Sequence, residues 1–196
     1  MQQKVLLIGN WKMNPATEKE AITLARYYKA LTYPKTIDVG CAVPVPYVAS
    51  VKKVLGKSKI TLGLQNVHPE KSGAFTGEYS LGMVAHLKPA FIIVGHSERR
   101  ALGETNAFVG QKVAATLKQK LTPIMCIGER ERDPEHRFLR VVADQITEGL
   151  ENVPRAALAR IVIAYEPVWA IGKDAAREMT PEECREMIIY IKKIII

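Results

Sequence analysis

Six short runs of β-branched and other apolar residues recur along the chain, and a stretch of helical periodicity follows each of them. The runs are Val5–Ile8, Ile37–Val43, Ile60–Leu64, Phe91–Val94, Leu121–Ile127 and Ile161–Tyr165. Several of them are apolar on both faces, as the strands of a buried parallel sheet are. Strands and helices that alternate at a spacing of roughly 30 residues are typical of α/β architectures. The pattern therefore predicts an α/β fold with a parallel sheet.

The predicted helices are amphipathic. Three groups of apolar residues each share one helix face: Ala21, Ile22, Ala25, Tyr28 and Leu31; Val109, Val113 and Leu117; and Leu139, Val142, Ile146 and Leu150. The last predicted helix begins at Thr180-Pro181-Glu182-Glu183, which combines a hydroxyl cap, a proline in the first turn and a glutamate three residues after the cap. No linker or low-complexity segment divides the 196 residues, so we expect a single domain over residues 1–196.

Two arrangements fit this alternation, an open doubly wound sheet and part of a (β/α)₈ barrel. Both place functional groups at the carboxyl ends of the strands. Periodicity by itself does not decide between them.

The composition excludes several classes of protein. Apolar residues make up 47% and charged residues 24% of the chain, which excludes a disordered chain and a collagen-like repeat. No apolar run reaches the roughly 18 residues that a membrane-spanning helix needs. The apolar run before Asn10 is too short for the core of a signal peptide. Three widely separated cysteines fit reduced thiols better than a disulfide framework. We therefore expect a cytoplasmic protein.

Lysines and arginines outnumber aspartates and glutamates by 28 to 20, a net charge of +8. These basic residues are scattered, and no aromatic residues lie among them to stack on bases. We therefore expect most of these basic residues to lie on solvated faces. The net charge favours small anions as binding partners over a nucleic acid.

The first strand exit carries an amide and an ammonium group. Asn10 and Lys12 are two residues apart, so in extended backbone they project to the same side. Together they can hold an oxyanion or a phosphate. A polar strand end with a solvated lysine is the alternative, and this segment alone favours it.

The fourth strand exit carries His96, with a short helix predicted directly behind it. Backbone N–H groups at such a position disfavour imidazolium, so a neutral ring could donate a hydrogen bond to a substrate carbonyl. A histidine that only caps or packs is the alternative. The four histidines show no metal-ligand spacing, and we expect no metal site.

The sixth strand exit carries Glu166 at the end of a buried strand, where a carboxylate is costly without a role or a partner. Pro167 and Gly172 are placed like the two ends of a small hinged lid, and Trp169 would dock it. An ordinary loop with a solvated glutamate is the alternative.

Five segments tie the chain to a known family. They read GNWKMN at Gly9–Asn14, QNVHPEKSGAFTGE at Gln65–Glu78, IIVGHSERR at Ile92–Arg100, PIMCIGER at Pro123–Arg130 and AYEPVWAIG at Ala164–Gly172. On these segments the chain resembles the triosephosphate isomerase family, in the family's order and spacing, from Lys4 to the final helix. The resemblance implies a (β/α)₈ barrel (TIM barrel), of which this chain carries about six βα units.

The resemblance also implies an activity. The reaction is the interconversion of dihydroxyacetone phosphate and D-glyceraldehyde 3-phosphate, in glycolysis and gluconeogenesis, without cofactor or metal. Glu166 matches the base that moves a proton between two substrate carbons, and His96 the neutral electrophile. Lys12 matches the cation that offsets phosphate and enediolate charge, with Asn10 beside it, and Gly172 a lid glycine whose N–H binds the phosphate.

The resemblance further implies a homodimer. Gln65–Glu78 resembles the loop that inserts into the partner subunit, and it would bring Thr76 close to the partner's site. The expected partners are thus a small phosphorylated triose and a second copy of the chain, with no nucleic acid and no membrane.

Two features depart from the family pattern. The lid continues Gly172-Lys173-Asp174-Ala175-Ala176-Arg177-Glu178-Met179 and is longer than the family's before the helix cap. A (β/α)₈ barrel typically takes about 250 residues, so we expect this chain to lack the last two βα units, as a truncated reading frame or a fragment. A six-unit protein that closes by association is the structural alternative. The functional alternative is a non-catalytic barrel fragment that retains the dimer loop or weak anion binding.

Overall fold

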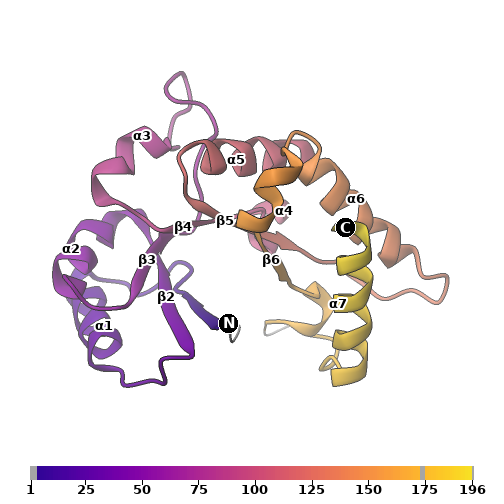
Figure 1. The fold of residues 1–196 in the computed structure, drawn as a ribbon, viewed down its shortest axis with the longest axis horizontal. Helices are drawn as coiled ribbons and strands as arrows, with labels where there is room; N and C mark the ends of the chain where they lie inside the picture. The colour runs from indigo at the N-terminus through magenta and orange to yellow at the C-terminus, as the bar shows by residue number, and fades with distance from the viewer. Residues whose placement is uncertain (1–3, 173–174, 196) are drawn as a thin grey trace. The chain divides into compact units, whose positions relative to one another are not determined.

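The computed structural model describes residues 4–172 and 175–195. The chain divides into two compact units, Met1–Ile93 with Gln119–Thr122 and Val94–Lys118 with Pro123–Ile196. Within each unit, strands that follow one another along the chain are hydrogen-bonded to each other. Along the chain, helical segments follow every strand (Figure 1). This arrangement confirms the predicted α/β fold built from βα units.

The first unit holds the strands β1 (Val5–Asn10), β2 (Ile37–Val43), β3 (Thr61–Leu64) and β4 (Phe91–Val94). Val94, the last residue of β4, belongs to the second unit. Their pairing is parallel, with Val5 opposite Ile37 at the start of β1 and β2. The predicted strands are therefore confirmed. The largest difference is at β1, which continues two residues further than expected, to Asn10.

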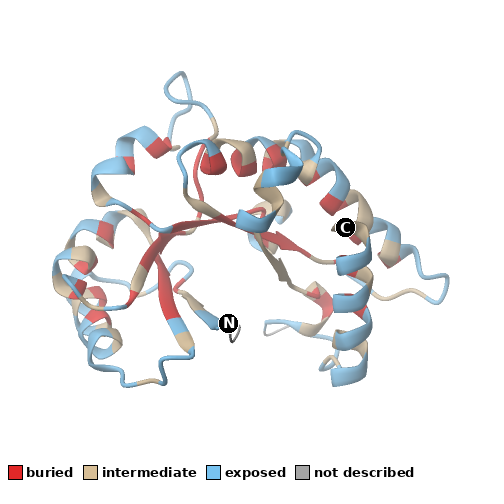
Figure 2. Cartoon of the chain, in the orientation of Figure 1, coloured by how far each residue is buried: buried red, intermediate tan, exposed pale blue. Residues whose placement is uncertain are grey.

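Burial differs between the strands of this unit (Figure 2). All four residues of β4 are buried, and so are the last five residues of β2. In β1, by contrast, Val5 and Leu7 are both 59% exposed. Among the described residues, β1 is hydrogen-bonded to one neighbouring strand, β2, which leaves its other edge unpaired there.

The helices of the first unit are α1 (Glu18–Ala30), α2 (Val45–Leu55), the single turn α3 (Leu81–Val84) and the 3₁₀ turn η1 (Ala85–Leu87). α1 begins in a capping box, in which Thr17 and Glu20 each accept the other's backbone N–H. Ala21 and Ala25 are buried, as predicted. Leu31 does not share that face, because the helix ends at Ala30 and extended backbone follows it, leaving Leu31 exposed.

The second unit contains α4 (Ser97–Ala101), α5 (Asn106–Lys118), most of β5 (Thr122–Ile127), α6 (Arg137–Leu150), η2 (Arg155–Arg160), β6 (Val162–Tyr165), η3 (Val168–Ala170) and α7 (Pro181–Ile195). β5 and β6 are parallel, and Ile124 lies opposite Val162. Both strands begin one residue later than predicted.

Apolar side chains of α5 and α6 form much of the core of the second unit. Val109, Val113 and Leu117 are buried on α5, as their spacing predicts. On α6 the two central residues of the predicted face, Val142 and Ile146, are fully buried. None of the helices within residues 4–172 and 175–195 is both long and apolar enough to cross a membrane.

Candidate active site

His96 lies directly after β4, at the start of α4. Gly95 makes the turn between them with a φ of 67°, and a Cβ there would lie 2.8 Å from Val109. The ring of His96 is buried, and its Nδ1 accepts the backbone N–H of Glu98 at 3.3 Å. Because an acceptor nitrogen carries no proton, the neutral ring is protonated at Nε2. The short helix predicted behind this histidine is confirmed.

Arg100 anchors the turn that carries His96. Its guanidinium donates to the carbonyl of Gly95 at 2.8 Å, to Oδ1 of Asn106 at 2.6 Å and to the carbonyl of Cys126 at 3.2 Å. Burial lowers the pKa of this arginine. A planar guanidinium can hold three acceptors at once, so it fixes the strand exit to α5 and β5.

Glu166 follows β6 directly. Its backbone N–H donates to the carbonyl of Ile127 at 2.7 Å, and its Oε2 accepts the N–H of Ser97 at 3.3 Å. A Cβ on Gly128 would lie 1.9 Å from the carbonyl oxygen of Glu166. Only glycine allows the exits of β5 and β6 to approach this closely, so Gly128 helps to set the position of the carboxylate.

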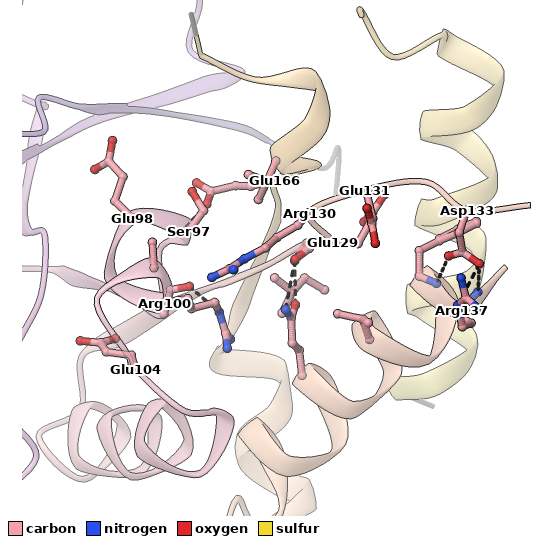
Figure 3. Close-up of a pocket in the computed structure, with 18 residues that line it drawn as sticks. Ser97, Glu98, Arg100, Glu104, Glu129, Arg130, Glu131, Asp133, Arg137 and Glu166 are labelled. Carbon is pink, nitrogen blue, oxygen red and sulfur yellow. Dashed lines mark hydrogen bonds and ion pairs between the residues drawn. The ribbon is translucent and has the colours of Figure 1, made fainter. Parts of the chain in front are cut away.

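The second unit brings His96 and Glu166 together. Nε2 of His96 lies 3.3 Å from Oε1 of Glu166, and 22% of the glutamate side chain remains exposed. Glu166 and Ser97 also line a cavity of about 730 Å³. Figure 3 shows these two residues at one end of the cavity and the ion pair of Asp133 and Arg137 at the other. A small substrate that enters this cavity would meet the carboxylate of Glu166, which also contacts the buried ring of His96.

A thiol lies close to the carboxylate. Burial, followed by the negative charge of Glu166, raises the pKa of Cys126 on β5. The thiol is therefore neutral over the physiological range. It cannot compete with Glu166 as a base.

Asn10 and Lys12 lie in the first unit. β1 ends at Asn10, and the backbone of Lys12 has a φ of 52°, so the extended conformation expected for this pair does not reach Lys12. The two residues instead form a turn, in which Oδ1 of Asn10 accepts the N–H of Lys12 at 3.0 Å. The amide of Gln65 holds the same turn by donating to the carbonyl of Lys12 at 2.8 Å.

Gly172 is exposed, with a φ of 82°. Trp169, three residues earlier, is buried. Both line a second cavity of about 630 Å³ in the same unit. Lys173 and Asp174, the first residues of the lid's departure from the family pattern, lie outside the described residues.

Glu129 is a functional candidate that sequence reasoning missed. This carboxylate is 1% exposed and accepts hydrogen bonds from the hydroxyl of Tyr165, from Nε1 of Trp169 and from Nε of Arg132, all within 3.0 Å. Burial and the charge of Glu129 raise the pKa of Tyr165. Its only signal was its place in Pro123–Arg130, at a strand exit. The carboxylate of Glu129 links the exit of β5 to the exit of β6 through its hydrogen bond with Tyr165.

The comparisons with known proteins agree with this geometry. Residues 5–196 match the family model described as triosephosphate isomerase. The chain belongs to the triosephosphate isomerase family. It is 41% identical to the triosephosphate isomerase of Herminiimonas arsenicoxydans over 193 residues, which cover 97% of this chain and 77% of that protein.

Two further relatives give the same result. The triosephosphate isomerase of Alkaliphilus metalliredigens is 41% identical, with 98% of this chain and 77% of the relative covered. The triosephosphate isomerase of Carboxydothermus hydrogenoformans is 37% identical, and the match covers 99% of this chain and 77% of that protein. Membership of the triosephosphate isomerase family confirms the predicted resemblance and favours an isomerase over the non-catalytic alternative.

Proposed function

We propose that the chain interconverts dihydroxyacetone phosphate and D-glyceraldehyde 3-phosphate by proton transfer through an enediolate. The observation that carries the proposal is the distance of 3.3 Å between Nε2 of His96 and Oε1 of Glu166. At this separation a base and a hydrogen-bond donor can act on neighbouring atoms of one small substrate. Membership of the triosephosphate isomerase family supports the same reaction.

Glu166 is the base. Its carboxylate takes a proton from the carbon next to the carbonyl and returns it to the neighbouring carbon, so it ends each turnover unprotonated. The N–H of Ser97 orients one oxygen of the carboxylate at 3.3 Å. Because part of the Glu166 side chain remains exposed, a small substrate can reach the carboxylate.

His96 is the electrophile. The proton on Nε2 faces the reacting groups, because Nδ1 is occupied by the N–H of Glu98. A neutral ring donates this proton to the carbonyl oxygen as negative charge develops there. The same nitrogen then moves protons between the two enediolate oxygens, which completes the conversion of ketone to aldehyde.

Lys12, Asn10 and Gly172 bind the phosphorylated substrate. The ammonium group of Lys12 offsets phosphate and enediolate charge, and Asn10 supports it by fixing the turn through the 3.0 Å hydrogen bond. The backbone N–H of Gly172 binds the phosphate when the lid closes. A closed lid also excludes water and limits loss of phosphate from the enediolate. No step in this scheme requires a cofactor or a metal.

The segment Gln65–Glu78 is the dimer contact in this proposal. Residues 71–77 at its tip are exposed, and Phe75, 43% exposed, stacks on the ring of His68 with centroids 3.9 Å apart. An exposed loop that an internal ring contact stiffens is well suited to insertion into a second copy of the chain. Thr76 would then approach the partner's binding residues.

Residues 1–196 belong to one (β/α)₈ domain, of which they form about six βα units. The cytoplasm is the proposed compartment, because free cysteines persist in a reducing environment. The scattered basic residues support a small anionic substrate as the partner, with no nucleic acid and no membrane.

The test measures the rate at which the purified chain converts each triose phosphate into the other. Coupled assays monitor the reaction in both directions, with and without a chelator. We expect conversion of both triose phosphates and no effect of the chelator. Conversion no faster than in buffer would contradict the proposed activity, and loss of conversion with the chelator would contradict a metal-independent mechanism.

A further inference from the structure

Two arginine side chains lie near the indole of Trp169, in the first hinge of the lid. The guanidinium of Arg177 lies 4.5 Å from the centre of the indole ring, and that of Arg132 lies 5.4 Å away. Arg132 is itself held by Glu129 through a hydrogen bond of 2.8 Å. Two guanidinium groups near one indole are consistent with cation–π attraction, which is strongest for tryptophan.

Arg177 makes a second contact, with the first turn of α7. Its two terminal nitrogens donate to both oxygens of Glu183 at 2.6 and 2.9 Å. Glu183 also accepts the N–H of Thr180 at 2.9 Å, within the capping box that begins the helix. These donors lower the pKa of Glu183 to about 2. The carboxylate is therefore ionised and fixed at the helix start.

A backbone contact joins the same two places. The N–H of Ala176 donates to the carbonyl of Trp169 at 2.7 Å. The residues on either side of Gly172 thus meet each other, while Gly172 itself is exposed. Arg177 lies in the part of the lid that departs from the family pattern, so this set of contacts belongs to this chain's own lid sequence.

We propose that Arg177 is a positioning residue for the phosphate-binding lid. By joining the indole of Trp169 to the carboxylate of Glu183, it fastens the two ends of the segment that carries Gly172 to the start of α7. The inference rests on the proposed function, because the lid matters only if Gly172 binds a phosphate. A segment with fixed ends loses less conformational freedom when it binds, so substrate affinity rises without any change in the proton-transfer groups.

The test uses the full chain with Trp11→Phe, which leaves Trp169 as the only one of the two tryptophans. Quenching of its fluorescence by acrylamide reports how accessible the indole is, and a neutral quencher does not respond to the charge that a variant removes. We expect Arg177→Met to raise the quenching constant about two-fold and KM about three- to ten-fold, with kcat changed less than about two-fold. Arg177→Lys retains the charge but not the planar stacking group, and should recover part of the loss.

Arg185→Met is the matched control, because it removes the same charge from an exposed position on α7. It should change neither quenching nor KM. Equal quenching in the Arg177→Met and Arg185→Met variants would overturn the proposal, and so would higher quenching with an unchanged KM. If the parent chain has no isomerase activity, the proposed function fails. The quenching comparison, repeated with inorganic phosphate, then decides whether Arg177 fixes Trp169 and whether that affects anion binding.

Discussion

Nε2 of His96 and Oε1 of Glu166 lie 3.3 Å apart, although Glu166 comes 70 residues after His96 in the sequence. Two backbone groups in the same helix start orient this pair. The N–H of Glu98 fixes the tautomer of the imidazole, and the N–H of Ser97 holds the carboxylate. A donor and a base are therefore oriented before any substrate binds, which is what proton abstraction next to a carbonyl requires.

Shortening the base tests its placement. Glu166→Asp retains the charge but withdraws the carboxylate by one methylene, and a displacement of about 1 Å can cost about 100-fold in rate. We expect kcat to fall by at least that factor, with KM changed only a few-fold. Glu98→Asp is the control, since it shortens the carboxylate near the other ring nitrogen of His96. Equal effects of the two variants in steady-state assays would remove Glu166 from its role.

Replacing the imidazole by an amide tests the donor. His96→Gln can still donate one hydrogen bond but moves protons poorly between oxygens. General acid–base catalysis contributes about 10²–10⁴-fold, so we expect kcat to fall by about 100-fold or more and residual activity to remain. In the parent, ¹⁵N spectra of the ring should show the proton on Nε2. A proton on Nδ1 would contradict the assigned hydrogen bond from Glu98.

The buried carboxylate of Glu129 should be important for stability. Glu129→Gln places an amide among the donors of Tyr165, Trp169 and Arg132 and leaves buried hydrogen-bonding groups unmatched. We expect the free energy of unfolding in urea to fall by about 3 kcal/mol. The matched control is Glu131→Gln, at an exposed position two residues later. It should change the free energy of unfolding by less than about 0.5 kcal/mol. Similar losses in the two variants would show that the Glu129 network does not stabilise the fold.

Acid should release the contact between Arg177 and Glu183. The hydrogen bonds from Arg177 and from the N–H of Thr180 lower the pKa of Glu183 from 4.5 to about 2. Its contribution to stability is therefore complete above pH 4.5 and is lost as the pH falls towards 2. The free energy of unfolding of Glu183→Gln should fall less steeply over this range than that of the parent. Parallel curves for the two proteins would contradict the assigned pairing.

Cysteine reactivity should follow burial. Burial raises the pKa of Cys41 to about 12, and also raises that of Cys126. Cys184 is only partly buried. We expect a thiol reagent at neutral pH to label one cysteine of the native chain, Cys184, and all three after denaturation. Fast labelling of Cys126, read by peptide mass, would contradict its buried position beside Glu166.

The sequence predicted most of the fold because each strand and helix carries its own local signal. The runs at Ile37–Val43 and Phe91–Val94 are the strands β2 and β4 without any shift. Local signals fail where the backbone leaves regular structure. The helical period suggested that Leu31 is buried, but the helix ends one residue earlier. Lys12 was expected in extended backbone, whereas its φ of 52° forms a turn that Gln65, far along the chain, helps to hold.

The candidate site was predictable in part for the same reason. His96 and Glu166 stand at strand exits, which parallel sheets bring together at one edge. Glu129 stands at such an exit too, but its partners Tyr165 and Trp169 follow 36 and 40 residues later. Nothing in the local sequence marks a carboxylate as buried when its donors come from another βα unit. Arg177 was missed because its role depends on the indole and the helix start between which it lies.

The most direct test of proton transfer by Glu166 is to supply dihydroxyacetone phosphate to the purified chain in D₂O and to follow both trioses by proton NMR. Proton transfer by a carboxylate that exchanges with solvent predicts isomerisation with deuterium on the carbon that receives the proton, and Glu166→Asp should slow both together. Conversion no faster than in buffer would contradict the isomerase activity. Conversion without solvent deuterium in the product, unchanged in Glu166→Asp, would contradict proton transfer by Glu166.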